Sequence, residues 1–216
     1  MKKLVIFDFD GTLADTSPGI LYCYNAAAVD FGYEKAPVER FAGIIGGHVD
    51  EGMQKVFGME KQQSFAAAEK YREYYNQKGQ RMATLYPGME TVLKRLKEQE
   101  KKIALATLKH ERFAEQMLIF LKIRDYFDGI CAFNGKSDCT KASLLQNACK
   151  TLQIPEKDSV LVGDSVFDAK GAETVGMDFI AVLYGLGFQK KEDLKDLQIS
   201  AVCKTPDQLL DAVAAL

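Results

Sequence analysis

The sequence lacks long apolar runs and has only 5 prolines among its 216 residues. With 47% hydrophobic residues, this composition excludes a disordered or collagen-like chain, because there is enough apolar material for a core. No apolar run approaches the roughly 18 residues that a membrane helix needs. The first run, Leu4 to Phe7, ends at Asp8, too early for a signal peptide. We therefore expect a soluble globular protein of the cytoplasm.

An excess of charge is also missing. The chain has 28 basic and 30 acidic residues, a formal net charge of −2 and a pI near 5.8. This balance gives no long-range field that would attract nucleic acid or an anionic membrane, so we expect neither as a partner. An anionic ligand must be held by local groups.

The cysteines form no C-x-x-C pair, and their number is odd. This pattern favours reduced thiols over a disulfide framework or a zinc site. The five residues are Cys23, Cys131, Cys139, Cys149 and Cys203.

Short, continuous apolar runs rich in β-branched residues predict strands that are buried on both faces, as in a parallel sheet. Helical patterns lie between the later runs, at 91–100, 113–121 and 141–152. This alternation predicts an α/β fold with a Rossmann-like, doubly wound parallel sheet. The expected strands are 4–7, 103–106, 130–133, 160–162 and 179–182.

An insertion is expected between the first two strands, since about 95 residues separate them where a few tens suffice for a crossover. The spacing of apolar residues over 61–80 predicts a long amphipathic helix. Tyr86-Pro87-Gly88 then interrupts the pattern. We predict a sheet domain of residues 1–14 and 83–216, and an inserted helical domain of residues 15–82.

Three predicted strands end at small polar or acidic residues: Asp8, Thr107 and Asp164. Each alone is an ordinary turn or helix-cap residue. Open parallel sheets, however, bind ligands outside the carboxyl ends of their strands, where these three residues would meet. Together they predict a ligand crevice.

Two acidic pairs sharpen this prediction. Asp8 and Asp10 are two residues apart with no basic neighbour in the sequence, which favours a bound hard cation such as Mg²⁺. Asp164 and Asp168 would share a helix face if the helix begins there, and could complete the metal ligands. Lys141 opens a predicted helix and could bind a phosphate, although a solvated surface lysine is the commoner outcome.

These residues resemble the motifs of the haloacid dehalogenase superfamily, in its phosphoglycolate-phosphatase-like branch with a helical cap. The resemblance spans nearly the whole chain. It rests on DFDGTLADT at 8–16, LATLK at 105–109, Lys141, and GDSVFD at 163–168.

The resemblance implies that Asp8 is the nucleophile and a metal ligand. Asp10 would be the general acid and base, and its main-chain carbonyl would also bind the metal. Asp164 would be a direct ligand, with Asp168 acting through water or behind the direct ligands. The implied cofactor is Mg²⁺, with Mn²⁺ as a substitute.

Thr107 and Lys141 would hold the phosphoryl group, and both are counted with the catalytic residues. Many relatives have Asn at the position of Leu108, so one side-chain contact to substrate is expected to be replaced by a main-chain amide. Lys109 matches a lysine that is common in this branch and is predicted to bind phosphate or substrate.

In the helical insert, the resemblance places a loop at 44–48 against substrate. Arg40 could meet a substrate carboxylate, and His48 could contact substrate or simply cap the next helix. His110 is expected to be structural.

We therefore predict a Mg²⁺-dependent phosphatase for a small phosphate monoester, with phosphoglycolate as the leading candidate. The chain is expected to be a monomer or weak homodimer. Alternatives are a β-phosphoglucomutase-like phosphotransferase, which usually has Val where Thr12 stands, and a nucleotidase or pyrophosphatase. A phospho-aspartate signalling domain is remote, because such domains are about 120 residues long and have no cap. A dehalogenase would not need Asp10.

Overall fold

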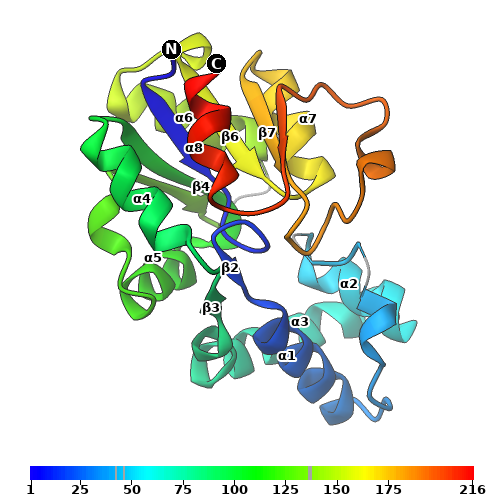
Figure 1. Cartoon of the computed structure of the whole chain (residues 1–216). Coiled ribbons are helices and arrows are strands. Elements are labelled where there is room, and N and C mark those ends of the chain that lie inside the picture. The colour runs from blue at the N-terminus through cyan, green and yellow to red at the C-terminus, as the bar shows by residue number, and fades with distance from the viewer. Residues whose placement is uncertain (42, 46, 136–137) are drawn as a thin grey trace. The chain divides into compact units, whose positions relative to one another are not determined.

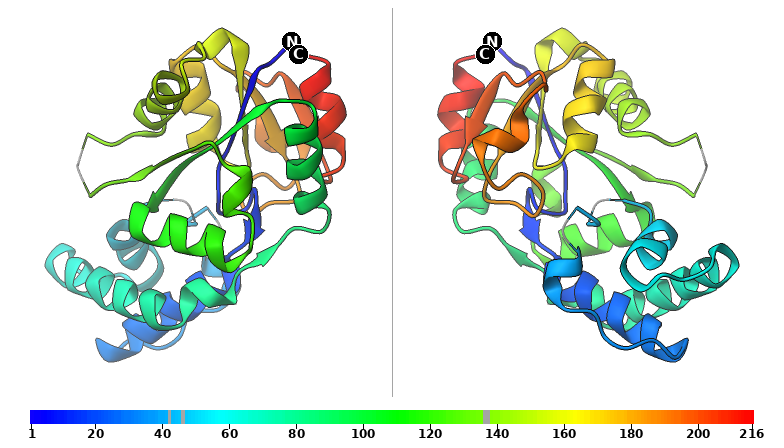
Figure 2. Two further views of the ribbon diagram at one scale, coloured as in Figure 1. Left: turned by 90° about the vertical axis from the view of Figure 1, so that its left-hand side faces the viewer. Right: turned by 90° about the vertical axis from the view of Figure 1, so that its right-hand side faces the viewer.

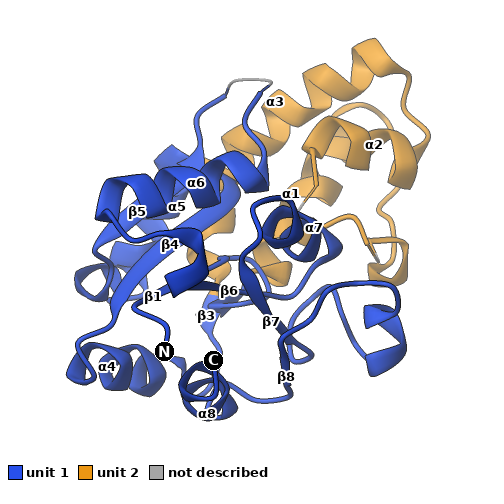
Figure 3. Cartoon of the chain, turned by 90° about the horizontal axis from the view of Figure 1, so that it is seen from above, with its two compact units in different colours: residues 1–15, 84–216 blue, residues 16–83 orange. Residues whose placement is uncertain are grey.

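A computed structural model describes residues 1–216 except 42, 46 and 136–137. The chain divides into two compact units, which Figure 3 colours separately. Unit 1 contains Met1–Asp15 and Thr84–Leu216, and unit 2 contains Thr16–Ala83. Both boundaries of unit 2 lie one residue later than the boundaries expected from the sequence, which were 15 and 82.

Unit 1 is built on a six-stranded parallel sheet with the order β5-β4-β1-β6-β7-β8 (Figure 1). The predicted α/β, doubly wound fold class is therefore confirmed. Edge strand β8 was not predicted, because three residues give too short a run to stand out. The strands are β1 (Leu4–Phe7), β4 (Lys102–His110), β5 (Gly129–Phe133), β6 (Ser159–Gly163), β7 (Asp178–Val182) and β8 (Ala201–Cys203).

Helices cover both faces of this sheet, as right-handed crossovers require. Helices α6 and α7 contact each other and lie on one face, whereas α4 and α8 contact each other on the opposite face (Figure 2). Strand β1 is completely buried, in keeping with its unbroken apolar run. The helices of unit 1 are α4 (Met89–Glu98), α5 (Glu111–Phe120), α6 (Lys141–Leu152), α7 (Val166–Thr174) and α8 (Gln208–Ala214).

The two connections between unit 1 and unit 2 pair with each other as a separate two-stranded antiparallel ribbon. It pairs β2 (Ala14–Asp15) with β3 (Thr84–Leu85), and Asp15 lies opposite Thr84. The Tyr86 amide extends this pairing by donating to the Leu13 carbonyl at 3.1 Å. The two passages therefore leave the sheet unit at neighbouring points.

Unit 2 is helical. It contains α1 (Ser17–Asp30), α2 (Val49–Phe57), α3 (Lys61–Gln77) and two 3₁₀ turns, η1 (Val38–Phe41) and η2 (Gly79–Met82). Helix α3 packs on α1 and α2, and the ring of Tyr71 stacks on that of Tyr75 in its core. The predicted helix extends to residue 80, but α3 ends at Gln77 and the chain continues in η2. Gly79 permits this turn to approach α1 closely, because a Cβ there would lie 2.5 Å from the Cys23 sulfur.

Two expectations from composition can be compared with this structure. In the described part of the chain, no helix is both long enough and apolar enough to span a bilayer. The five cysteines, all of them described, are free thiols in the structure.

Candidate functional site

Three carboxylates meet at the carboxyl edge of the sheet. Asp8 follows β1 and Asp164 follows the adjacent strand β6, while Asp168 lies in the first turn of α7. One ligand oxygen from each lies within 4.8 Å of the others. Their side chains are buried, with Asp168 completely inaccessible. The convergence expected from the strand ends is therefore present for Asp8 and Asp164.

Lys141, the first residue of α6, neutralises part of this cluster. Its Nζ donates to Asp8 Oδ1 at 2.6 Å and to the Ala106 carbonyl at 2.8 Å. A third contact joins Nζ to Asp168 Oδ1 at 2.7 Å. Two hydrogen bonds and one ion pair therefore place three oxygen atoms around the ammonium group. Lys141 is only 5% exposed, so the alternative of a solvated surface lysine is wrong.

The second acidic pair is arranged differently from the predicted helix face. Helix α7 begins at Val166, and Ser165 is its N-cap, so Asp164 precedes the helix. Asp168 forms a capping box, in which its Oδ2 accepts from the Ser165 amide at 3.1 Å and hydroxyl at 2.6 Å. Asp168 therefore joins the start of α7 to Lys141, while Asp164 belongs to the strand end.

Burial and mutual repulsion raise the pKa of two of these carboxyls. Desolvation raises the pKa of Asp8 to about 6, although Lys141 counteracts it. Desolvation, followed by the charges of Asp168 and Asp8, raises the pKa of Asp164 to about 8. The rise in pKa is therefore larger for Asp164 than for Asp8. Asp164 has no lysine partner among the ion pairs of the described residues.

The loop after β7 holds the Asp164 carboxylate. The Leu186 and Gly187 amides donate to its Oδ2 at 2.7 and 2.8 Å. Gly11, with φ of 78°, lies against the same oxygen, because a Cβ at Gly11 would be 2.0 Å from it. Sequence reasoning missed this loop. The sequence feature that could have revealed this loop is Gly185-Leu186-Gly187, which begins three residues after the predicted strand 179–182. The loop follows the carboxyl end of that strand, as the other motifs follow theirs.

Asp10 also has a basic partner that its sequence neighbourhood did not reveal. Lys109 Nζ lies 3.1 Å from Asp10 Oδ1, and the two side chains are only 7% and 12% exposed. Asp8 and Asp10 have no basic neighbour in the sequence, as stated above, but each has a lysine partner in space. Lys109 of β4 and Lys141 of α6 are each more than ninety residues away in the sequence from the aspartate that they contact.

Thr107 does not follow a strand as predicted. Strand β4 continues to His110, with an irregular register between Thr107 and His110. Thr107 is buried, and its Oγ1 accepts from the Lys109 amide at 3.2 Å. Leu108 packs against the hydrophobic core, so its side chain occupies an apolar position where relatives are expected to present Asn.

The structural role expected of His110 is confirmed. His110 is the N-cap of α5, and its Nδ1 accepts from the Arg112 amide at 3.3 Å.

The predicted substrate residues of unit 2 have a different environment. Arg40 lies in η1 and is exposed, as is His48. His48 is the N-cap residue of α2, as the capping alternative expects, but within the described residues its side chain makes no capping hydrogen bond. Gly46, in the predicted substrate loop, lies outside the described residues.

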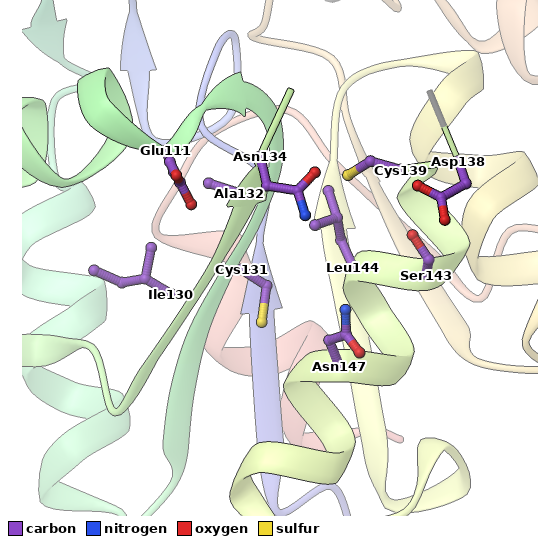
Figure 4. Close-up of a pocket in the computed structure, with 10 residues that line it drawn as sticks. All are labelled: Glu111, Ile130, Cys131, Ala132, Asn134, Asp138, Cys139, Ser143, Leu144 and Asn147. Atoms are coloured by element: carbon purple, nitrogen blue, oxygen red, sulfur yellow. The ribbon is translucent and has the colours of Figure 1, made fainter. Parts of the chain in front are cut away.

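A pocket of about 360 Å³ lies elsewhere in unit 1, between edge strand β5 and helix α6 (Figure 4). Its lining includes Cys131, Cys139 and Asn147, and none of the predicted site residues. It is therefore distinct from the carboxylate cluster.

The carboxylate cluster fits a divalent cation. Its donors are the carboxylate oxygens that hard cations prefer, and three lie close enough to share one ion. Both amide bonds to Asp164 fall on Oδ2, which leaves Oδ1 for another ligand. A cation would also relieve the repulsion that raises the pKa of Asp164.

Comparison with known proteins gives consistent matches. A family model described as haloacid dehalogenase-like hydrolase matches residues 5–182. Phosphoglycolate phosphatase of Psychrobacter arcticus is 28% identical over 232 residues, covering 100% of this chain and 94% of that protein. Tyrosine-protein kinase PtkA of Mycobacterium tuberculosis is 29% identical over 214 residues, covering 98% and 72%. The crystal structure of a predicted phosphatase from Clostridium acetobutylicum is 27% identical, with a TM-score of 0.91 and 100% coverage of both chains.

These relatives carry different activities in their names, so a name alone does not define the reaction here. The family model, in contrast, covers most of the chain and includes the strands and helices that bring Asp8, Lys141 and Asp164 together. The resemblance stated from the motifs is thereby confirmed, and the chain belongs to the haloacid dehalogenase-like hydrolase family.

Proposed function

We propose that the protein is a phosphatase that hydrolyses a small phosphate monoester through a phosphoryl group carried on Asp8. The observation that carries this proposal is the buried cluster of Asp8, Asp164 and Asp168 around Lys141 at the edge of the sheet. Phosphoryl transfer needs positioning and charge compensation more than a strong base, and this cluster provides both.

Asp8 is suited to the role of nucleophile. Its pKa of about 6 leaves the carboxylate largely ionised at pH 7. Lys141 holds Oδ1 at 2.6 Å, so the other oxygen, Oδ2, is available to attack phosphorus. The same lysine would compensate negative charge on the phosphoryl oxygens, and Thr107, one strand away, would contribute a hydroxyl.

Asp8, Asp164 and the main-chain carbonyl of Asp10 would hold Mg²⁺, and Asp168 would act behind these ligands. When bound, the cation would supply positive charge that stabilises the transferring phosphoryl group. Lys141 and Asp168 would keep the Asp8 carboxylate in place beside it.

Asp10 would move the protons. In the first step it would give a proton to the departing substrate oxygen, and in the second it would accept one from the water that attacks the phosphoryl group on Asp8. Lys109 contacts Asp10 Oδ1 at 3.1 Å and would exchange this contact for one with a substrate oxygen. The Leu108 main-chain amide would provide a further contact for the phosphate.

Phosphoglycolate is the leading candidate substrate. A relative that covers the whole chain bears the name phosphoglycolate phosphatase. In unit 2, the exposed guanidinium of Arg40 could pair with a substrate carboxylate, and His48 could provide a second polar contact.

A screen of phosphate release over several dozen phosphate esters, with Mg²⁺ and with excess chelator, tests this function. We expect inorganic phosphate from phosphoglycolate or a similarly small ester, and loss of turnover in chelator. Phosphate transferred to a second sugar or to a protein tyrosine, without release of inorganic phosphate, would instead indicate a mutase or a kinase. Full turnover in chelator would contradict the metal assignment.

A further inference from the structure

The loop of Gly185, Leu186 and Gly187 encloses one side of Asp164. The Leu186 and Gly187 amides both donate to Asp164 Oδ2, and the Phe188 amide donates to the Asp164 main-chain carbonyl at 2.7 Å. Three consecutive amides therefore hold one residue. Such a contact fixes both the position of the main chain and the rotation of the carboxylate.

The glycines in this loop are required by close approach. A Cβ at Gly185 would lie 2.3 Å from the Gly11 carbonyl oxygen and 2.5 Å from Asp164 Cβ. A Cβ at Gly187 would lie 2.3 Å from the Asp164 carbonyl oxygen. These obstacles are largely main-chain atoms, which cannot move aside as a flexible side chain would. An alanine at either position must therefore push the loop away from Asp164.

The side chains at the two ends of the loop, Tyr184 and Phe188, are anchored independently of Asp164. The Tyr184 hydroxyl donates to the Thr12 carbonyl at 3.2 Å, and Phe188 is buried in the hydrophobic core. Gln189 Nε2 donates to the Gly185 carbonyl at 2.9 Å, which closes the turn on itself. The loop is therefore a preformed support.

We infer that the loop at 185–187 is the positioning element that orients Asp164, so that Oδ2 is held by amides and Oδ1 is presented to the cation. This inference rests on the metal site of the proposed function. In this arrangement Oδ1 would be the oxygen of Asp164 available to the ion, and the loop residues would act through Asp164. Partners that orient a metal ligand in this way commonly change metal affinity by about 10- to 100-fold when they are altered.

The test is Mn²⁺ binding to the substrate-free protein, measured from the paramagnetic resonance signal of unbound Mn²⁺. Gly187→Ala should raise the Kd for Mn²⁺ by about 10- to 100-fold. Gly129→Ala is the matched control, because a Cβ there meets only the Leu152 side chain, at 3.6 Å or more. It should leave the Kd unchanged. Saturating Mn²⁺ should restore much of the phosphatase turnover of Gly187→Ala, which general damage to the fold would not allow.

Gln189→Ala decides the question if Gly187→Ala does not fold. Gln189 is exposed, so its removal should leave the melting temperature of the metal-free protein unchanged while weakening Mn²⁺ binding by about tenfold. Wild-type affinity in folded Gly187→Ala, or in Gln189→Ala when Gly187→Ala does not fold, would overturn the inference and leave the proposed function intact. If the wild-type protein itself binds no Mn²⁺, the proposed metal site fails, and the inference fails with it.

Discussion

The carboxylate cluster of unit 1 and the predicted substrate residues of unit 2 differ in how their side chains are held. Asp8, Lys141 and Asp168 are buried and joined by short contacts. Arg40 and His48 are exposed. A buried side chain held by such contacts is confined to one geometry, whereas an exposed side chain can adopt many. The comparison teaches that substitutions in the cluster should abolish the chemistry, and that those in unit 2 should alter its selectivity.

The largest effect is expected at Asp8. Asp8→Asn should lower turnover by at least about 10³-fold, because an amide is not a competent nucleophile toward phosphorus. The fold should persist, since the substitution removes one of several crowded charges. Turnover and a thermal melt measure the two effects.

Asp128→Asn is a matched control for that prediction. Asp128, like Asp8, is a carboxylate paired with lysine, and it accepts from Lys97 at 2.8 Å and Lys102 at 3.0 Å. It lies before β5 rather than in the cluster, so the variant should keep wild-type turnover. Normal turnover in Asp8→Asn would show that Asp8 is not the nucleophile. The carboxylate cluster would then not be the site of the chemistry.

Asp10→Asn should separate the two steps of the reaction. Alkyl phosphates need a proton on the leaving oxygen, whose pKa as an alcohol is about 15, and their turnover should fall by about 10²- to 10⁴-fold. The p-nitrophenolate group, with a pKa of about 7, leaves without this help. The mutant should therefore release a burst of nitrophenolate approaching one equivalent and then turn over slowly, because water attack still lacks its base.

Acid-quenched Asp10→Asn should carry acid-stable but alkali-labile phosphate on Asp8 after this burst. Equal, modest losses with both ester types and no burst would show that another group moves the protons.

The pH dependence of metal binding provides the third test. The pKa of Asp164 is raised to about 8, so at pH 6 to 8 a cation must displace a proton that the free protein holds. Rising pH removes this competitor, and the Kd for Mn²⁺ should fall by about tenfold per pH unit up to pH 8. Below pH 6 the dependence should steepen, because the pKa of Asp8 is about 6.

Asp164→Asn is the control for this pH dependence. It should bind Mn²⁺ more weakly and lose the slope between pH 6 and 8. A flat wild-type profile over that range would mean that Asp164 is already ionised or is not a ligand.

The smallest effects are expected in unit 2. Arg40→Ala and His48→Ala should each change the ranking of natural substrates several-fold, while p-nitrophenyl phosphate hydrolysis stays near wild type. Arg81→Ala, at another exposed arginine of the unit, should change neither. Equal losses of turnover with all esters would indicate that Arg40 and His48 have a structural role. They would then not determine substrate selectivity.

The fold was predictable because buried parallel strands leave a local signature. The continuous run of Leu4 to Phe7 and its four counterparts are visible without any knowledge of their neighbours. The three-residue strand β8 and the extension of β4 to His110 depend on pairing with other strands, which the local sequence does not record.

The meeting of Asp8 and Asp164 at one edge of the sheet was predictable, whereas the contacts of the candidate site were predictable only in part. Strand ends and motifs identified Asp8, Asp10 and Asp164, because parallel topology brings such ends together. The salt bridges from Lys109 and Lys141 join positions more than ninety residues apart in the sequence. The amides that hold Asp164 are main-chain groups, which every residue except proline possesses, so no residue type marks them.

The ribbon of β2 and β3 has a consequence for engineering. Asp15 and Thr84 face each other in an antiparallel pair, so the last residue before unit 2 and the first residue after it are neighbours in space. A two-residue turn of the Asn-Gly type could join them as an ordinary hairpin. The sheet unit is thus compatible with replacement of the whole helical segment by a tight turn, or by another helical segment whose ends lie equally close together.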